Sequence, residues 1–178
     1  MKKRSMADLN RLTAEEYKGS EKLPVVLVLD DVRSAYNVGS IFRTADAFRI
    51  EGIYLCGISA RPPHKDISKT ALGATESVAW KYFEKVTDAV RSLKNDGFGI
   101  YILEQAHESI PLDKFAPPSG SKIAFVFGHE VFGVKEELFP MSDGCIEIPQ
   151  FGTKHSFNVA ISAGIVLWDT YSKMKVEG

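Results

Sequence analysis

The sequence predicts an α/β domain with a mostly parallel sheet flanked by helices. Short, continuous apolar runs recur along the chain, which is typical of strands that are buried on both faces. Stretches with apolar residues at helical spacing lie between these runs, and such alternation is typical of parallel sheets. The 178 residues fit a single domain, since domains usually run to about 100–200 residues.

The strands are expected at the apolar runs, of which 25–29 (VVLVL) is the clearest. The core therefore begins near Pro24. The other strands are expected at 52–58, 78–83, 99–103, 123–127 and 145–148. The run at 78–83 is expected to be shorter and more exposed than the others.

The helices are expected between the strands, each beginning at a residue that makes a good N-cap. Asn37 is the expected cap of the first long helix, and Thr87 is the expected cap of a later helix that stops before Gly97. A short helix is expected at 135–139. Ser156 is the expected cap of a long closing helix, with Asn158 in its first turn.

Residues 1–22 are expected to form a helical arm ahead of the main domain at 23–178. The arm is polar, with a net charge of +2. Thr13 and Glu16 have the spacing of a capping box. Leu9, Leu12 and Tyr17 could form a narrow apolar stripe on a short helix. The arm either packs on the domain or a partner, or is a solvated tail.

The overall charge argues against a protein that holds nucleic acid by bulk charge. Lysine and arginine number 22 and the acidic residues 23, which gives a net charge of -1. Two distant cysteines exclude a disulfide scaffold and fit a reducing cytoplasm. We expect no secretory signal and no membrane partner, because no apolar run approaches the ~20 residues of a membrane span.

Several widespread catalytic motifs are missing from the sequence. The chain has no G-x-G-x-x-G fingerprint, no phosphate-binding P-loop and no G-x-S-x-G elbow. His129-Glu130 begins like H-E-x-x-H, but Gly133 stands where the second histidine belongs, and the four histidines have no metal-ligand spacing. We therefore expect no metal, and find no support for redox, hydrolase or kinase chemistry.

Three polar segments follow or adjoin the carboxyl ends of expected strands, the edge where open α/β sheets bind ligands. They are 37–48 (NVGSIFRTADAF), 127–133 (FGHEVFG) and 148–160 (IPQFGTKHSFNVA). In this order they resemble the three motifs of the SpoU/TrmH family of RNA ribose 2′-O-methyltransferases, in the SPOUT superfamily.

The resemblance implies a SPOUT methyltransferase domain at 23–178 with a C-terminal trefoil knot. It also implies S-adenosylmethionine (AdoMet) as cofactor, tRNA or rRNA as substrate, and a homodimer with the active site at its interface. General topology rules alone would predict an unknotted doubly wound sheet.

The resemblance makes Arg43 the catalytic arginine, accompanied by four polar residues of the motifs: Asn37, Glu130, Ser156 and Asn158. A guanidinium does not readily lose its proton, so we expect Arg43 to orient a substrate phosphate and stabilise a developing alkoxide rather than to act as a base. On its own, an arginine here would more often be a salt-bridged surface residue.

The resemblance places the donor against backbone and apolar side chains of four residues: Leu103, Gly128, Ile148 and Phe157. For the apolar residues the alternative is plain core packing. RNA is expected to meet local basic clusters near the site, at Arg33, Arg61, Lys65 and Lys69.

The expected function is AdoMet-dependent methyl transfer to a ribose 2′-hydroxyl of tRNA or rRNA in the cytoplasm. The alternative is a catalytically inactive SPOUT-fold RNA-binding module. A dinucleotide-binding α/β protein is a third class, but the chain lacks its glycine fingerprint.

Overall fold

A computed structural model describes residues 1, 3–5 and 11–175. Within them lies one seven-stranded sheet, ordered β3-β2-β1-β6-β4-β7-β5, whose strand pairings are all parallel. The strands are β1 (Leu23–Asp30), β2 (Ile50–Cys56), β3 (Trp80–Phe83), β4 (Phe98–Leu103), β5 (Ile110–Pro111), β6 (Lys122–Phe127) and β7 (Gly144–Glu147). The predicted α/β class is confirmed, and the two-residue strand β5 was not predicted.

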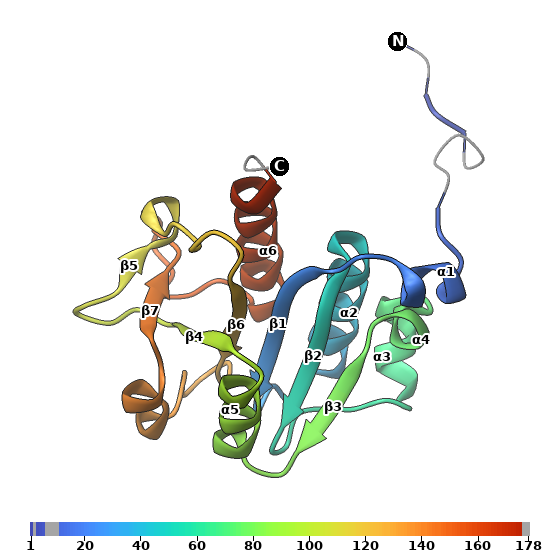
Figure 1. Ribbon diagram of the computed structural model, residues 1–178. Coiled ribbons are helices and arrows are strands. Elements are labelled where there is room, and N and C mark those ends of the chain that lie inside the picture. The colour runs from blue at the N-terminus through green and yellow to red at the C-terminus, as the bar shows by residue number, and fades with distance from the viewer. Residues whose placement is uncertain (2, 6–10, 176–178) are drawn as a thin grey trace.

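Helices cover both faces of the sheet (Figure 1). They are α1 (Ala14–Gly19), α2 (Ala35–Phe48), α3 (Lys65–Ala71), α4 (Ala74–Ser77), α5 (Val86–Asn95) and α6 (Val159–Lys175), with 3₁₀ turns η2 (Leu112–Lys114) and η3 (Glu136–Met141). Helices α2 and α6 pack against one face and α5 against the other. In the described part of the chain, no helix is long and apolar enough to cross a membrane.

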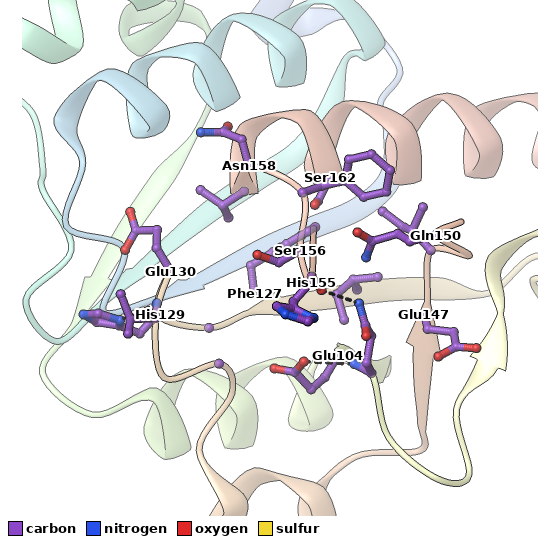
Figure 2. Close-up of a pocket in the computed structure, with 18 of the residues that line it drawn as sticks. Glu104, Phe127, His129, Glu130, Glu147, Gln150, His155, Ser156, Asn158 and Ser162 are labelled. Atoms are coloured by element: carbon purple, nitrogen blue, oxygen red, sulfur yellow. Dashed lines mark hydrogen bonds between the residues drawn. The ribbon is translucent and has the colours of Figure 1, made fainter. Parts of the chain in front are cut away.

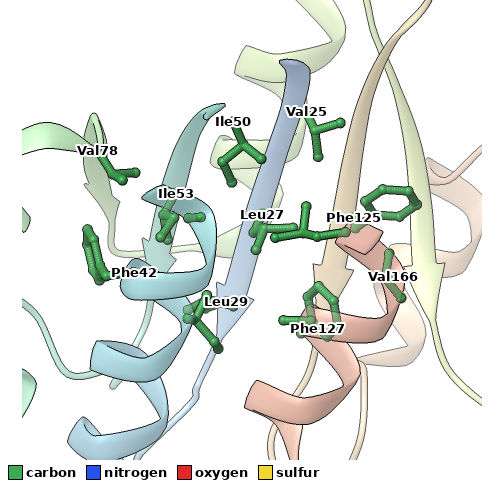
Figure 3. Packing of buried hydrophobic residues seen from close by; sticks show 14 of the residues in the cluster. Val25, Leu27, Leu29, Phe42, Ile50, Ile53, Val78, Phe125, Phe127 and Val166 are labelled. Carbon is green, nitrogen blue, oxygen red and sulfur yellow. The ribbon is translucent and has the colours of Figure 1, made fainter. Parts of the chain in front are cut away.

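The central strand β1 builds two cores at once, because successive strand side chains point to opposite faces. Val25, Leu27 and Leu29 belong to the cluster under α2 and α6, shown in Figure 3. Val26 and Val28 belong to the cluster under α5. A strand buried on both faces reads as a continuous apolar run, which is why this element was predictable.

The predicted caps of α2 and α5 are wrong. Ser34, not Asn37, caps α2: its Oγ accepts the Asn37 N–H at 3.3 Å, so Asn37 is the third residue of the helix. Serine caps as well as asparagine does, and here it stands three residues earlier. Thr87 lies inside α5, whose cap position is held by Lys85 without a side-chain hydrogen bond.

The N-terminal helix α1 packs on the domain. Its predicted capping box is confirmed, since Thr13 and Glu16 bond each other's backbone N–H groups. Tyr17 is buried in the core cluster beneath α2. Leu12 is exposed, and Leu9 lies outside the described residues.

Candidate active site

A pocket of about 490 Å³ lies at the carboxyl ends of β4, β6 and β7, beside the start of α6 (Figure 2). This volume falls within the ~300–1,000 Å³ of cofactor and small-molecule sites. Seven of the predicted site residues line it: Leu103, Gly128, Glu130, Ile148, Ser156, Phe157 and Asn158. The second and third motif segments therefore meet at one cavity.

The loop after β6 is narrow at its neck, and glycine makes this possible. His129 and Gly133 exchange two backbone hydrogen bonds, of 3.1 and 2.9 Å. A Cβ atom at Gly128 would overlap the backbone of Gly133. Gly133 itself has φ of 70° and has the Glu104 carboxylate over its Cα. Any side chain at Gly128 would thus displace the pocket wall.

Glu130 reaches from this loop to the amino end of α2. Its carboxylate accepts the N–H groups of Arg33 at 3.4 Å and Ser34 at 3.3 Å. Partial burial raises the pKa of Glu130, but hydrogen bonds from backbone N–H groups and the Asn37 side chain bring that pKa below its ordinary value. The carboxylate is therefore ionised at neutral pH.

Asn158 joins the third motif to the first. Its Nδ2 donates to Asn37 Oδ1 at 3.1 Å, and its Oδ1 accepts the Ala160 N–H at 2.9 Å. The second bond is the N-cap interaction of α6, so the prediction that Ser156 caps this helix is wrong. Ser156 is instead an exposed residue of the pocket wall. Asn158 thus bonds Asn37, and the Asn37 side chain in turn lowers the pKa of Glu130.

Arg43 does not line this pocket. It lies on α2 six residues after Asn37, about 600° further around the helix, and its side chain is exposed. Thr44, on the same helix face as Asn37, is the residue that faces Gly164 of α6. Within one chain, Arg43 is therefore not part of the pocket wall.

The pocket also contains polar residues that were not predicted. Glu104 follows Leu103 at the end of β4, and its Oε2 accepts the Val134 N–H at 3.2 Å. Gln105 Nε2 donates to the His155 carbonyl at 2.8 Å, which ties the loop after β4 to the loop before α6 (Figure 2). Their position after a buried strand was the available signal, since ligands bind at that edge.

The four predicted RNA-contacting side chains are exposed: Arg33, Arg61, Lys65 and Lys69. Arg61 lies over the Tyr82 ring, 4.1 Å from its centre. Lys69 pairs with Asp66 at 2.7 Å, which offsets part of its charge. The basic residues follow the carboxyl ends of β1 and β2, next to the pocket along the sheet edge.

Comparison with known proteins decides the family. The model of the SpoU rRNA Methylase family matches residues 24–168. The chain belongs to this family. The match spans all three motif segments, so the SpoU resemblance found in the sequence is confirmed.

Relatives of this SpoU chain act on RNA. A 23S rRNA (guanosine-2′-O-)-methyltransferase of Neisseria meningitidis is 32% identical over 147 residues, which are 83% of this chain and 58% of the relative. A tRNA (guanosine(18)-2′-O)-methyltransferase of Thermus thermophilus is 28% identical over 169 residues, 93% of this chain and 84% of the relative.

A solved methyltransferase structure shares the fold. The AdoMet-bound rRNA methyltransferase from Sinorhizobium meliloti matches with a TM-score of 0.79 and 26% identity, covering 85% of this chain and 57% of that one. The chain thus spans between 57% and 84% of the length of these three relatives.

Proposed function

We propose that this protein transfers a methyl group from AdoMet to a ribose 2′-hydroxyl of tRNA or rRNA. The contacts among Glu130, Asn37 and Asn158 carry this proposal, because they join the first motif to the cavity that the other two motifs line. The intact set favours an enzyme over an inactive RNA-binding module. The named activities of the relatives support the same reaction.

The pocket fits AdoMet by size and lining. Leu103, Ile148 and Phe157 offer apolar surface for the adenosyl group, and the backbone around Gly128 allows close approach. When bound, AdoMet supplies the activated methyl group. The protein's part is to hold donor and acceptor in line, which converts an encounter into a step within one complex.

On the acceptor side, the protein must orient a ribose hydroxyl that is a weak acid. The ionised Glu130 and the Asn37 amide can hold the ribose by hydrogen bonds. Arg43 can grip a substrate phosphate bidentately and stabilise the negative charge that develops on the 2′-oxygen. We assign Arg43 this electrostatic role, because its guanidinium keeps its proton.

A homodimer would bring Arg43 to the pocket. Arg43 is exposed on α2, and the neighbouring helix α6 exposes Ile161 at 56% and Trp168 at 60%. A groove of about 580 Å³ beside Trp168 continues this face. Large exposed apolar side chains of this kind mark interaction surfaces. We therefore propose that α2 and α6 pair with a second copy, so that Arg43 of one chain serves the pocket of the other.

The RNA is proposed to lie along the basic edge formed by Arg33, Arg61, Lys65 and Lys69. Single-stranded RNA bases stack on aromatic rings and guanidinium planes, and the Arg61–Tyr82 pair offers both. Arg61→Ala should weaken RNA binding and flatten its salt dependence, whereas Arg91→Ala on α5 should leave both unchanged. Equal salt slopes for the two variants would remove Arg61 from the interface.

The C-terminal trefoil knot is also part of the proposal. The loop 104–121 contacts the final segment at two places: Gln105 bonds the His155 carbonyl before α6, and Lys173 Nζ in α6 donates to the Leu112 carbonyl at 2.6 Å. These contacts support threading of the segment 148–158 through that loop. A crystal structure with this segment outside the loop would contradict it.

Calorimetric titration with AdoMet tests the proposal at its first step. We expect saturable binding at one site per chain. If folded protein shows no heat of binding at millimolar AdoMet, the proposed methyltransferase activity is refuted. We also propose a cytoplasmic location, because tRNA and rRNA are found there.

A further inference from the structure

A buried carboxylate that plays no part in the proposed reaction lies close to the pocket. Asp30 is the last residue of the central strand β1 and is only 1% exposed. Burial raises the pKa of Asp30, and the nearby Lys135 ammonium opposes that change. An isolated carboxylate is costly to bury, so Asp30 requires a charged partner.

Lys135 pairs with two adjacent carboxylates. Its Nζ lies 3.0 Å from Asp30 Oδ1 and 2.8 Å from Asp31 Oδ2. Asp31 has the left-handed φ of 55°, and its Oδ1 accepts the Ile58 N–H at 2.9 Å. The three charges thus join the segments that follow β1, β2 and β6.

Lys135 stands at the end of the loop that carries Glu130. The loop after β6 consequently meets the loop after β1 twice: through Lys135 to Asp30 and Asp31, and through Glu130 to the N–H groups of residues 33 and 34. The first connection fixes the base of the loop, and the second places the carboxylate beside Asn37.

Asp30 is buried, whereas the Lys135 side chain is 44% exposed. Such a pair contributes little to stability compared with apolar packing, but it requires a defined geometry. We propose that Lys135 is a positioning residue. Through its pairs with Asp30 and Asp31, it fixes the position of the Glu130 loop relative to the start of α2. The proposal rests on the methyl transfer proposed above for its effect on turnover. Its structural part can be tested without that reaction.

Amide hydrogen exchange at Ser34 reports whether the Glu130 loop keeps its position against α2. The Ser34 N–H is bonded to Glu130, whereas the neighbouring Val32 N–H is bonded to Ser59 Oγ at 2.9 Å and provides an internal control. Lys135→Met should speed exchange at Ser34 about tenfold or more and leave Val32 unchanged. Lys135→Arg keeps the charge and should exchange nearly as the wild type does.

A double variant separates positioning from stability. In Lys135→Met with Asp30→Asn, the buried unpaired charge is gone, so the melting temperature should recover while Ser34 stays unprotected. This variant also carries the test if Lys135→Met alone does not fold. Lys94→Met on α5 removes a 4.0 Å pair with Asp143; it is the matched control and should leave Ser34 protected.

Turnover on total RNA from a strain lacking the gene completes the test. Lys135→Met and the double variant should lose about 10- to 100-fold in methyl transfer, because a misplaced group costs that much. Wild-type exchange at Ser34 in Lys135→Met, or recovery of protection and turnover together with stability in the double variant, would overturn the proposal. Failure of the wild type to bind AdoMet would instead refute the proposed methyl transfer. The positioning role of Lys135 would then be tested by the exchange rates alone.

Discussion

Asn158 Nδ2 donates a 3.1 Å hydrogen bond to Asn37 Oδ1, across 121 residues of sequence. The same Asn158 caps α6 through its Oδ1, and the side chain of the same Asn37 lowers the pKa of Glu130. One amide pair therefore links the starts of α2 and α6 to the loop after β6. Asn158 uses its Nδ2 for the bond to Asn37 and its Oδ1 for the helix cap, so substitutions can remove the two bonds separately.

Substitutions at Asn158 should separate capping from catalysis. Asn158→Asp keeps a good N-cap acceptor but has no N–H to donate to Asn37, so the melting temperature should hold while methyl transfer falls at least about tenfold. Asn158→Ala should also lose about 1 kcal/mol of stability, or roughly 2–4 °C. Thermal unfolding and turnover measured on both variants check this. Wild-type turnover in Asn158→Asp would show that the amide link is not needed.

Gly128→Ala should damage the donor pocket. The added methyl group would overlap the Gly133 backbone, and such overpacking typically costs about 1–3 kcal/mol. We expect a lower melting temperature and AdoMet affinity reduced by about tenfold or more in calorimetry. Gly19→Ala in α1 meets open space and is the control. Equal AdoMet affinity in the two variants would mean that the neck at Gly128 does not shape the site.

The Glu130 hydrogen bonds should make a pH-dependent contribution to stability. Its folded-state pKa lies below the ordinary 4.5, so the contribution is complete above that value and is lost as the pH falls through the lowered one. The melting temperature of Glu130→Gln should therefore lie below that of the wild type at neutral pH, and the gap should close in acid. Melting curves from about pH 7 to about pH 3.5 test this. A constant gap would exclude the titration of Glu130 as its cause.

Trp168→Arg should separate the proposed dimer. A charge on the exposed face of α6 opposes burial there, so light scattering should change from the mass of two chains to that of one. Ile110→Arg on the outer strand β5 has a similarly exposed apolar side chain and should remain a dimer. A wild-type monomer at all concentrations would contradict the dimer and leave Arg43 apart from the pocket.

The fold was predictable where one local pattern determined the outcome. The continuous apolar run in β1 is typical of a strand that is buried on both faces. The Thr13–Glu16 capping box involves only four consecutive residues, so the local sequence is enough to predict it. The cap of α2 was not predictable, because Ser34 and Asn37 are both good caps and tertiary packing chose between them.

Seven of the residues that line the pocket were predictable from the sequence, but Glu104, Gln105 and the connections between the motifs were not. The motifs supplied Asn37, Glu130 and Asn158, yet their contact depends on the sheet order, which brings β6 next to β1. Lys135 and Asp30 were missed, because either alone is an ordinary charged residue. The exposed place of Arg43 depends on helix rotation relative to α6, which the motif spacing does not specify.

The central claim is methyl transfer to a ribose hydroxyl, and one assay tests it directly. Total tRNA and rRNA from a strain lacking the gene is incubated with the protein and isotopically labelled AdoMet, digested to nucleosides and analysed by mass spectrometry. We predict labelled 2′-O-methylnucleoside with the wild type, and none with Arg43→Ala although its AdoMet affinity stays near normal. Label on a base alone, or no label in RNA from either source, would contradict the account.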